Sequence, residues 1–126
     1  MLGPLGYSFA PAVRRSRTLY KWIKPLADWY ANVAGYRKMG LKYDDLLIEE
    51  NPEVQKALSR LTPREEYDRA YRMKVASLLS VNHKPLPKDK WLPASEDVRY
   101  LKPYVEEAVK ETEERHIWDT MEVRRK

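Results

Sequence analysis

The sequence of 126 residues contains no cysteine, only four glycines and only two histidines. Without cysteine the chain can form no disulfide, no zinc–thiolate site, no iron–sulfur cluster and no cysteine nucleophile. Its few glycines build no glycine-rich loop that could cradle a phosphate group. The histidines, His83 and His116, have no second ligand at a metal-binding spacing, so both are expected to be incidental. We therefore expect no metal and no cofactor.

Long apolar runs are also missing. The longest, Val75–Val81, is far shorter than the ~18 residues that a membrane-spanning helix needs. Any association with a membrane is therefore expected to be peripheral or to go through a partner.

Basic charge is concentrated in the first third of the chain. The formal net charge is +5, but residues 1–42 alone carry eight Lys or Arg and one Asp, a net charge of +7. Arginines and aromatic residues without an acid before Asp28 are the charge pattern of a mitochondrial targeting segment. A basic tail that packs on an acidic surface explains the composition equally well.

Apolar spacing predicts an all-α fold with four to five helices, irregular Pro-rich connections and an extended N-terminal arm. We divide the chain into a basic arm with a short helix (residues 1–24), a helical domain (25–118) and a C-terminal tail (119–126). Pro25 is expected to start or kink a helix that runs to Ala34. No segment alternates with period two, so no strand is expected.

Local signals mark where the helices begin and end. Asn51-Pro52 and Thr62-Pro63 are helix starts, with Glu65 placed for a capping box. Gly35 is expected to end the preceding helix in a left-handed conformation, and Gly40 to give a second bend. Asp44 is expected to cap the helical turn that follows it. In the later connections, we expect Trp91 and Leu92 to anchor a Pro-bounded loop to the core and residues 95–99 to form a helical turn.

Each expected helix has an apolar face. Residues 52–61 place Val54, Ala57, Leu58 and Leu61 on one face, and the helix after Pro103 does the same with Tyr104, Val105, Ala108 and Val109. For the helix after Pro63, the expected buried residues are Tyr67, Ala70, Tyr71, Val75 and Leu78, with Glu65–Arg69 and Asp68–Arg72 pairs on its exposed side. The last helix is highly charged until Ile117 and Trp118, which favours either an extension over another protein or a frayed end.

The first third holds the candidate docking residues. Basic and aromatic side chains there are Arg14, Arg15, Arg17, Tyr20, Trp22, Trp29 and Tyr36. Such residues can bind RNA by phosphate contacts and stacking. They are also typical anchors in an interface with an integral-membrane complex. Composition does not separate these two hypotheses.

Two further clusters of charged residues could have a function. The cations Arg37, Lys38 and Lys42 surround a helix–loop–helix elbow and could contact a partner or lipid phosphates, although an ordinary elbow explains them too. The acids Asp44, Asp45, Glu49 and Glu50 can serve as helix caps and a solvated face, as a match for a basic partner, or as wet carboxylates near a proton-uptake route. Carboxylates without a pocket that shifts their pKa values make no acid–base catalyst, so we predict no autonomous catalysis.

Several blocks of the sequence, in the same order, closely resemble the subunit 7 family of mitochondrial ubiquinol–cytochrome c reductase (complex III), especially its fungal members. They are Ala34–Leu46, Glu49–Pro52, Ala57–Leu61, Tyr67–Arg72, Leu86–Trp91 and Glu96–Tyr104. The likeness covers roughly residues 25–118.

The resemblance implies an all-α accessory subunit without catalysis or a cofactor of its own. Family members lie on the matrix face of the inner membrane, peripheral to it, and contact cytochrome b, the core subunits and neighbouring small subunits. No nucleic acid is then expected as a partner. Beside this resemblance we hypothesise that the arm docks on cytochrome b, that Arg37, Lys38 and Lys42 contact lipid phosphates such as those of cardiolipin, and that Glu49 and Glu50 line a proton-uptake route. The alternative function is an RNA-binding or mitoribosome-associated protein.

Overall fold

The computed structural model describes residues 4–122 of the chain, and within them it contains helices and no strand. The α-helices are α1 (Ala10–Arg15), α2 (Arg17–Val33), α3 (Pro52–Leu58), α4 (Pro63–Val81) and α5 (Lys102–Thr120). Three short 3₁₀ helices lie between them: η1 (Tyr36–Met39), η2 (Tyr43–Leu46) and η3 (Lys88–Lys90). The prediction of an all-α fold with four to five helices and irregular connections is confirmed.

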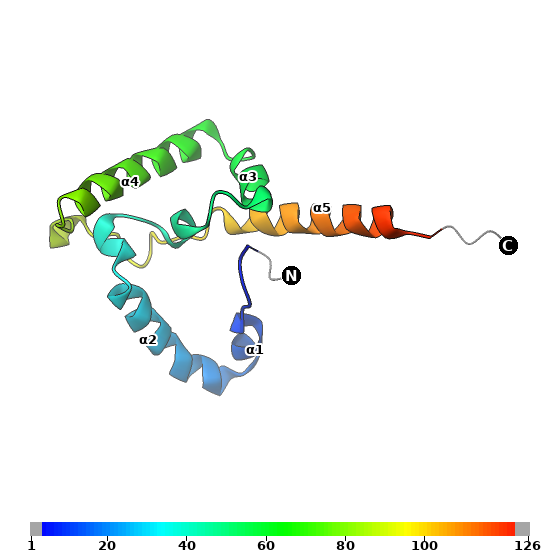
Figure 1. The fold of residues 1–126 in the computed structure, drawn as a ribbon. Coiled ribbons are helices and arrows are strands. Elements are labelled where there is room, and N and C mark those ends of the chain that lie inside the picture. The colour runs from blue at the N-terminus through cyan, green and yellow to red at the C-terminus, as the bar shows by residue number, and fades with distance from the viewer. Residues whose placement is uncertain (1–3, 123–126) are drawn as a thin grey trace.

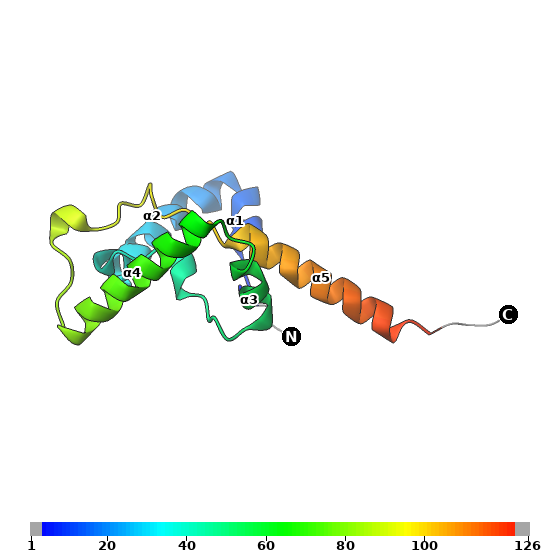
Figure 2. The same ribbon diagram turned by 90° about the horizontal axis from the view of Figure 1, so that it is seen from above.

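The helices form an open arrangement. Figure 1 shows α1 and α2 as a bent arm on one side of the molecule, with α4 on the other. Helix α5 projects away from both, and the turned view in Figure 2 shows the same projection. Large parts of α2, α4 and α5 therefore face outward.

The hydrophobic core is small and lies between α3 and the start of α5. Its buried members are Val54, Ala57, Leu61, Leu101 and Val105. The apolar faces predicted for these two helices are thus confirmed. Leu5, from the N-terminal arm, also packs against this cluster, so the arm folds back onto the chain.

Most of the predicted helix boundaries are confirmed, because each rests on a local hydrogen bond or dihedral angle. The Asn51 side chain accepts a hydrogen bond from the Glu53 N–H at 2.9 Å. Thr62 and Glu65 form the reciprocal capping box of α4. Gly35 and Gly40 have φ values of 82° and 76°, the left-handed conformation that glycine adopts without strain.

Three local predictions are wrong. Pro25 was expected to start or kink a helix. The start is wrong, because α2 runs through Pro25 from Arg17 to Val33, and the kink stays a prediction. Residues 94–96 form a turn and residues 97–100 belong to no helix or strand, where a helical turn over residues 95–99 was expected. Trp91 and Leu92 anchor their loop to the elbow η1 and not to the core. The Leu92 N–H donates to the Arg37 carbonyl at 3.1 Å, and the Lys38 ammonium lies 5.4 Å from the Trp91 ring centroid.

The predicted division into arm, domain and tail stays a prediction. Helix α2 continues without a break across the proposed boundary between residues 24 and 25. Residues 1–3 of the arm and 123–126 of the tail lie outside the described part of the chain.

The predicted orientation of α4 is wrong. Its expected apolar face is largely exposed, and the side that faces the chain carries Arg69 and Ala76 as buried residues. Of the five residues expected to be buried, Tyr67, Ala70, Tyr71 and Leu78 are exposed, and Val75 is half-buried. The arginines expected to pair on the exposed side are instead turned inward. Helix α4 is attached to the chain through charge rather than through an apolar face.

Candidate functional site

Helices α1 and α2 present most of the predicted docking residues. Neither helix has a buried residue. Arg14 and Arg15 lie in the last turn of α1, and Arg17 is the first residue of α2. None of the ion pairs found among residues 4–122 involves these three arginines. Their charge is therefore available to a partner.

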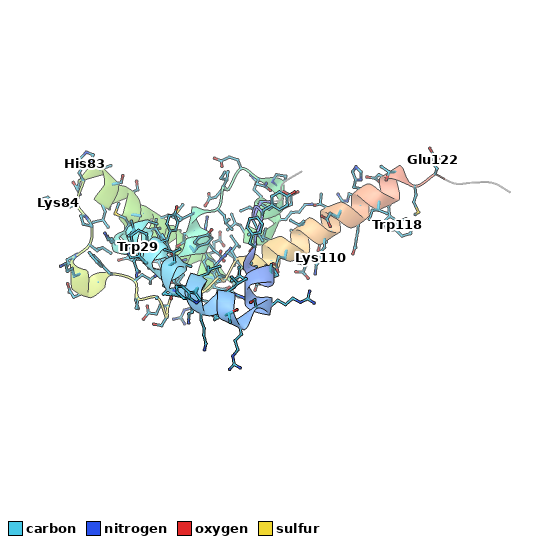
Figure 3. The ribbon with its side chains drawn as sticks, turned by 90° about the horizontal axis from the view of Figure 1, so that it is seen from below. Trp29, His83, Lys84, Lys110, Trp118 and Glu122 are labelled. Atoms are coloured by element: carbon cyan, nitrogen blue, oxygen red, sulfur yellow. The ribbon has the colours of Figure 1, made fainter. Side chains whose placement is uncertain are left out.

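One side of α2 is a continuous apolar stripe. Its members recur at helical spacing and are all exposed: Leu19, Trp22, Ile23, Leu26, Trp29, Tyr30 and Val33. Trp22 is 83% exposed, and Figure 3 labels Trp29 on the same helix. Tyr20 lies on another side, with the Lys24 ammonium 6.0 Å from its ring centroid. An exposed stripe of this size marks an interaction surface.

Tyr36 is the exception among the predicted docking residues. It is only 8% exposed, and its hydroxyl donates to Asp97 Oδ2 at 2.6 Å. Burial, together with the hydrogen bond to Asp97, raises the pKa of Tyr36 to about 12. This tyrosine serves the chain's own structure and offers a partner little surface.

The three elbow cations are held differently. Arg37 is nearly buried and donates to Asp97 Oδ2 at 2.9 Å and to Asn32 Oδ1 at 2.8 Å. Lys38 lies over the Trp91 ring, and the Lys42 ammonium lies 5.7 Å from the Tyr100 ring centroid. Burial opposes the ionisation of Asp97, but hydrogen bonds from Tyr36, the Tyr43 N–H and Arg37 outweigh it and hold the pKa of Asp97 below its usual value.

Asp44 is fully buried and caps a distant helix. It was expected to cap the turn that follows it, and that prediction is wrong. Its Oδ2 accepts hydrogen bonds from the N–H groups of Leu101 and Lys102 at 2.9 and 3.0 Å, the first turn of α5. Its Oδ1 accepts from the Arg99 guanidinium. A carboxylate suits this position because the first N–H groups of a helix lack partners within the helix.

Asp45, also buried, joins η2 to α4. Arg72 donates to both of its carboxylate oxygens, at 2.7 and 2.9 Å, and Arg69 donates to Oδ1 at 3.3 Å. The Tyr100 hydroxyl donates to Oδ1 at 2.5 Å. Burial opposes ionisation, but the bonds from Arg72 and Tyr100 prevail and the pKa of Asp45 is lowered. The hypothesis of a solvated acidic face is wrong for Asp44 and Asp45, which match cations of their own chain.

Glu49 and Glu50 are more open. The Arg69 guanidinium donates to Glu49 Oε1 at 2.7 Å, and the Glu49 side chain is 53% exposed. Glu50 is exposed as well. A shallow groove of 470 Å³ runs beside this ion pair, lined by Glu49, Leu58, Ser59, Glu66, Arg69, Ala70 and Met73. The carboxylate of Glu49 therefore meets solvent while it holds Arg69.

Sequence reasoning missed the residues that complete these clusters: Arg69, Arg72, Asp97, Arg99 and Tyr100. One signal was present, because Arg69 and Arg72 are three residues apart and share a side of a helix. Across residues 4–122, no group of three His, Asp or Glu is placed to hold a metal ion. The carboxylates of Asp44, Asp45 and Asp97 join distant segments of this chain to one another, and the exposed helix faces are open to a partner.

Comparison with known proteins gives the same family by two routes. A family model described as "Ubiquinol-cytochrome C reductase complex 14kD subunit" matches residues 17–116. Cytochrome b-c1 complex subunit 7 from Neurospora crassa is 47% identical over 116 residues, covering 92% of this chain and 94% of that protein. The subunit 7 of Saccharomyces cerevisiae is 45% identical over 111 residues, covering 88% of this chain and 87% of its own length. That of Pongo abelii is 40% identical over 98 residues, covering 78% of this chain and 87% of its own.

Proposed function

The chain belongs to the family of the 14 kDa subunit of the ubiquinol–cytochrome c reductase complex, and we propose that it acts there as a scaffold that docks through α1 and α2. It is a non-catalytic accessory subunit of the cytochrome b-c1 complex, complex III, and the complex itself is the oxidoreductase. Its role in our proposal is to support assembly and stability, and thereby electron transfer from ubiquinol to cytochrome c.

As a subunit of complex III the chain belongs to the mitochondrial inner membrane. No helix in residues 4–122 is long and apolar enough to cross a bilayer. In our proposal the chain lies peripherally on the matrix side, against cytochrome b, the core subunits and neighbouring small subunits. The targeting-like charge of its first third supports this placement.

The single observation that carries the docking proposal is that neither α1 nor α2 has a buried residue. A 17-residue helix with seven large apolar side chains on one side and no buried residue is not stabilised by the chain alone. The arginines of the arm add charge that steers it toward an acidic partner. We propose that α1 and α2 contact the matrix loops of cytochrome b through Arg14, Arg15, Arg17, Tyr20, Trp22 and Trp29.

The test is purification through a C-terminal tag in mild detergent, read by visible and ultraviolet absorbance. We expect b- and c-type haem absorbance to co-purify with the chain. Reversing the arm's charges with Arg14→Glu, Arg15→Glu and Arg17→Glu should reduce the haem recovered. The matched control reverses three exposed loop lysines, Lys84, Lys88 and Lys90, and should keep it. A haem-free preparation that carries RNA and releases it in salt would favour the RNA-binding alternative.

A lipid contact is a narrower proposal. Lys38 and Lys42 are partly exposed beside aromatic rings and can reach lipid phosphates, such as those of cardiolipin. Arg37 contributes least, because Asp97 and Asn32 occupy its guanidinium. Changing Lys38 and Lys42 to Gln should lower the cardiolipin that co-purifies with the intact complex. Unchanged lipid content would end this proposal and leave the docking proposal intact.

A proton-uptake role for Glu49 and Glu50 also stays a proposal. The exposure of both carboxylates and the groove beside Glu49 support it. Replacing both by Gln removes two ionisable groups and should lower turnover or shift the pH profile of the assembled complex. Unchanged turnover and an unchanged profile would contradict the proposal.

A further inference from the structure

Helix α4 is amphipathic in the opposite sense to an ordinary surface helix, because its charged side faces the rest of the chain. Its inward side carries Arg69 and Arg72, which bind Asp45 and Glu49. Its outward side carries exposed aromatic and aliphatic residues, among them Tyr67, Tyr71, Leu78 and Val81, although the small Ala76 is buried on the inward side. A surface helix normally turns its apolar side to the core and its charges to water. This arrangement leaves apolar side chains of α4 exposed to water, which is typical of a surface that binds a partner.

The outward residues form a regular stripe, called here the α4 stripe. Its members follow alternating steps of four and three residues: Tyr67, Tyr71, Lys74, Leu78 and Val81. The four apolar or aromatic members are between 57% and 74% exposed. Steps of four and three are the heptad spacing by which one helix packs along another. Tyrosine is also enriched among the residues that dominate binding energy in interfaces.

We propose that the α4 stripe is a second docking surface, which binds an amphipathic helix of another complex III subunit with a carboxylate opposite Lys74. This inference rests on the proposed function, because the partner is a member of the same complex. It adds an attachment on α4, distinct in sequence and in place from the α1–α2 arm (Figures 1 and 2). The chain then bridges two neighbours.

The charged residues on and beside the α4 stripe indicate which kind of partner can bind there. Lys74 lies within it and Arg64 lies one turn before Tyr67, both exposed. The nearest carboxylates of the helix, Glu66 and Asp68, lie on its two flanks by helical spacing. None of the ion pairs found in residues 4–122 involves Lys74 or Arg64. A partner that buries the stripe must neutralise Lys74, so it needs an acidic side chain there.

The same lysine disfavours a second copy of this chain as the occupant. Lys74 is the central member of the stripe. In an antiparallel two-fold pairing, Tyr67 faces Val81 of the other copy, and Lys74 faces its own equivalent. Two ammonium groups in contact within an apolar interface repel each other without compensation. A different chain with an acid at that position has no such conflict.

The test introduces a photo-crosslinking residue at Tyr71 in the full chain and illuminates the assembled complex. We expect a crosslink to a peptide of another subunit, with a carboxylate on a helical segment. The matched control carries the same group at Ser80, which is exposed on α4 but off the stripe, and should crosslink much less. A crosslink to a second copy of the chain, to lipid alone or to nothing would overturn the inference.

Substitutions give a second, independent measurement. Lys74→Glu would place a carboxylate opposite the carboxylate of the partner. It should lower incorporation into the complex about tenfold, as expected at the centre of an interface. Lys74→Arg should keep incorporation, and so should Ser80→Lys on the other side of the helix. Full incorporation of Lys74→Glu would contradict the inference. Failure of the proposed function is distinguishable, because even the unsubstituted chain would then purify without haem.

Discussion

Two regions of this molecule have similar side chains and opposite environments. Around α3 and the start of α5, Val54, Ala57, Leu101 and Val105 are fully buried, and so is the carboxylate of Asp44. In α1 and α2 nothing is buried, although α2 carries seven large apolar residues on one side. The difference shows that the chain stabilises its own α3–α5 region and leaves its N-terminal arm to be stabilised by a neighbour.

The two regions differ because the contact between α3 and α5 removes apolar surface from water, whereas α2 keeps its apolar surface exposed. Burying apolar surface contributes roughly 25 cal/mol per Å², and α2 gains almost none of this within the chain. An isolated helix shorter than about 12–15 residues is marginal in water, and one of 17 residues is little better. The arm should therefore open most readily in the free chain and become ordered in the complex.

The largest effect is expected from Asp45→Ala, in the buried cluster that joins η2 to α4. This change leaves Arg69 and Arg72 facing each other without their shared carboxylate and removes the acceptor of the Tyr100 hydroxyl. Removing one partner of a buried ion pair costs about 3–5 kcal/mol of the free energy of unfolding. Urea unfolding followed by circular dichroism measures it. Asp68→Ala, which removes an exposed acid of α4, the helix that carries Arg69 and Arg72, is the control and should change little. Equal losses in both variants would contradict the role given to Asp45.

Leu101→Ala should come next. Leu101 is fully buried between α3 and α5, and its N–H donates to Asp44. The substitution removes apolar contacts and leaves a cavity, which costs about 2–4 kcal/mol in cores of this kind. Thermal unfolding of the variant measures the loss. Val98→Ala is the control, because Val98 is exposed just before the same segment. A loss in the control as large as that of Leu101→Ala would mean that the core is not where we place it.

The sequence was sufficient for features that local chemistry decides. Asn51 and Thr62 hydrogen-bond to N–H groups two or three residues away, so their capping roles could be read without a fold. The same holds for Gly35 and Gly40, whose left-handed conformation depends on the absence of a side chain. Family membership was predictable for a different reason, because several separated blocks matched in order.

The sequence was insufficient where distant segments decide. Asp44 and Asp45 look like caps or solvated acids until Arg99, Tyr100 and Arg72 are known to converge on them. The orientation of α4 was mispredicted because hydrophobic periodicity identifies an apolar side but not what covers it. In a subunit of a larger assembly that side can face a partner, while the charged side faces the chain.

The free energy of unfolding should fall at both low and high pH, because of ionisable groups in the η2–α4 cluster and in the elbow. The pKa values of Asp45 and Asp97 are lowered below 3.8 in the folded chain. Their contribution to the free energy of unfolding is therefore present above pH 3.8 and is lost as the pH falls through the folded values. Burial and carboxylate neighbours raise the pKa values of Tyr36 and Tyr100 from 10.0 to about 12. Their contribution is present below pH 10 and is lost as the pH rises toward 12.

Urea unfolding across this pH range checks both losses of stability. Asp45→Asn and Asp97→Asn should each reduce the fall in the free energy of unfolding at low pH. Tyr36→Phe and Tyr100→Phe should each reduce its fall at high pH. If the free energy of unfolding falls equally at low pH in the unsubstituted chain and in both Asn variants, other carboxylates control acid unfolding.

The smallest effect on the free chain, and the sharpest contrast between the regions, is expected from Trp22→Ser. Trp22 is 83% exposed on α2, so its loss should change the free energy of unfolding of the isolated chain by less than about 0.5 kcal/mol. The matched variant is Trp91→Ser, because the Trp91 indole N–H donates to the Leu86 carbonyl at 2.7 Å and its ring lies against Lys38. That variant should destabilise the isolated chain measurably.

In the assembled complex the contribution of Trp22 should become visible. Competition between tagged and untagged chains for incorporation should show Trp22→Ser losing to the unsubstituted chain, although both fold equally well alone. This outcome would place the contribution of α2 in its contact with a neighbour, since nothing in the described chain covers the Trp22 ring. Equal incorporation would mean that the apolar side of α2 contacts no partner, and the contrast between the two regions would then need another explanation.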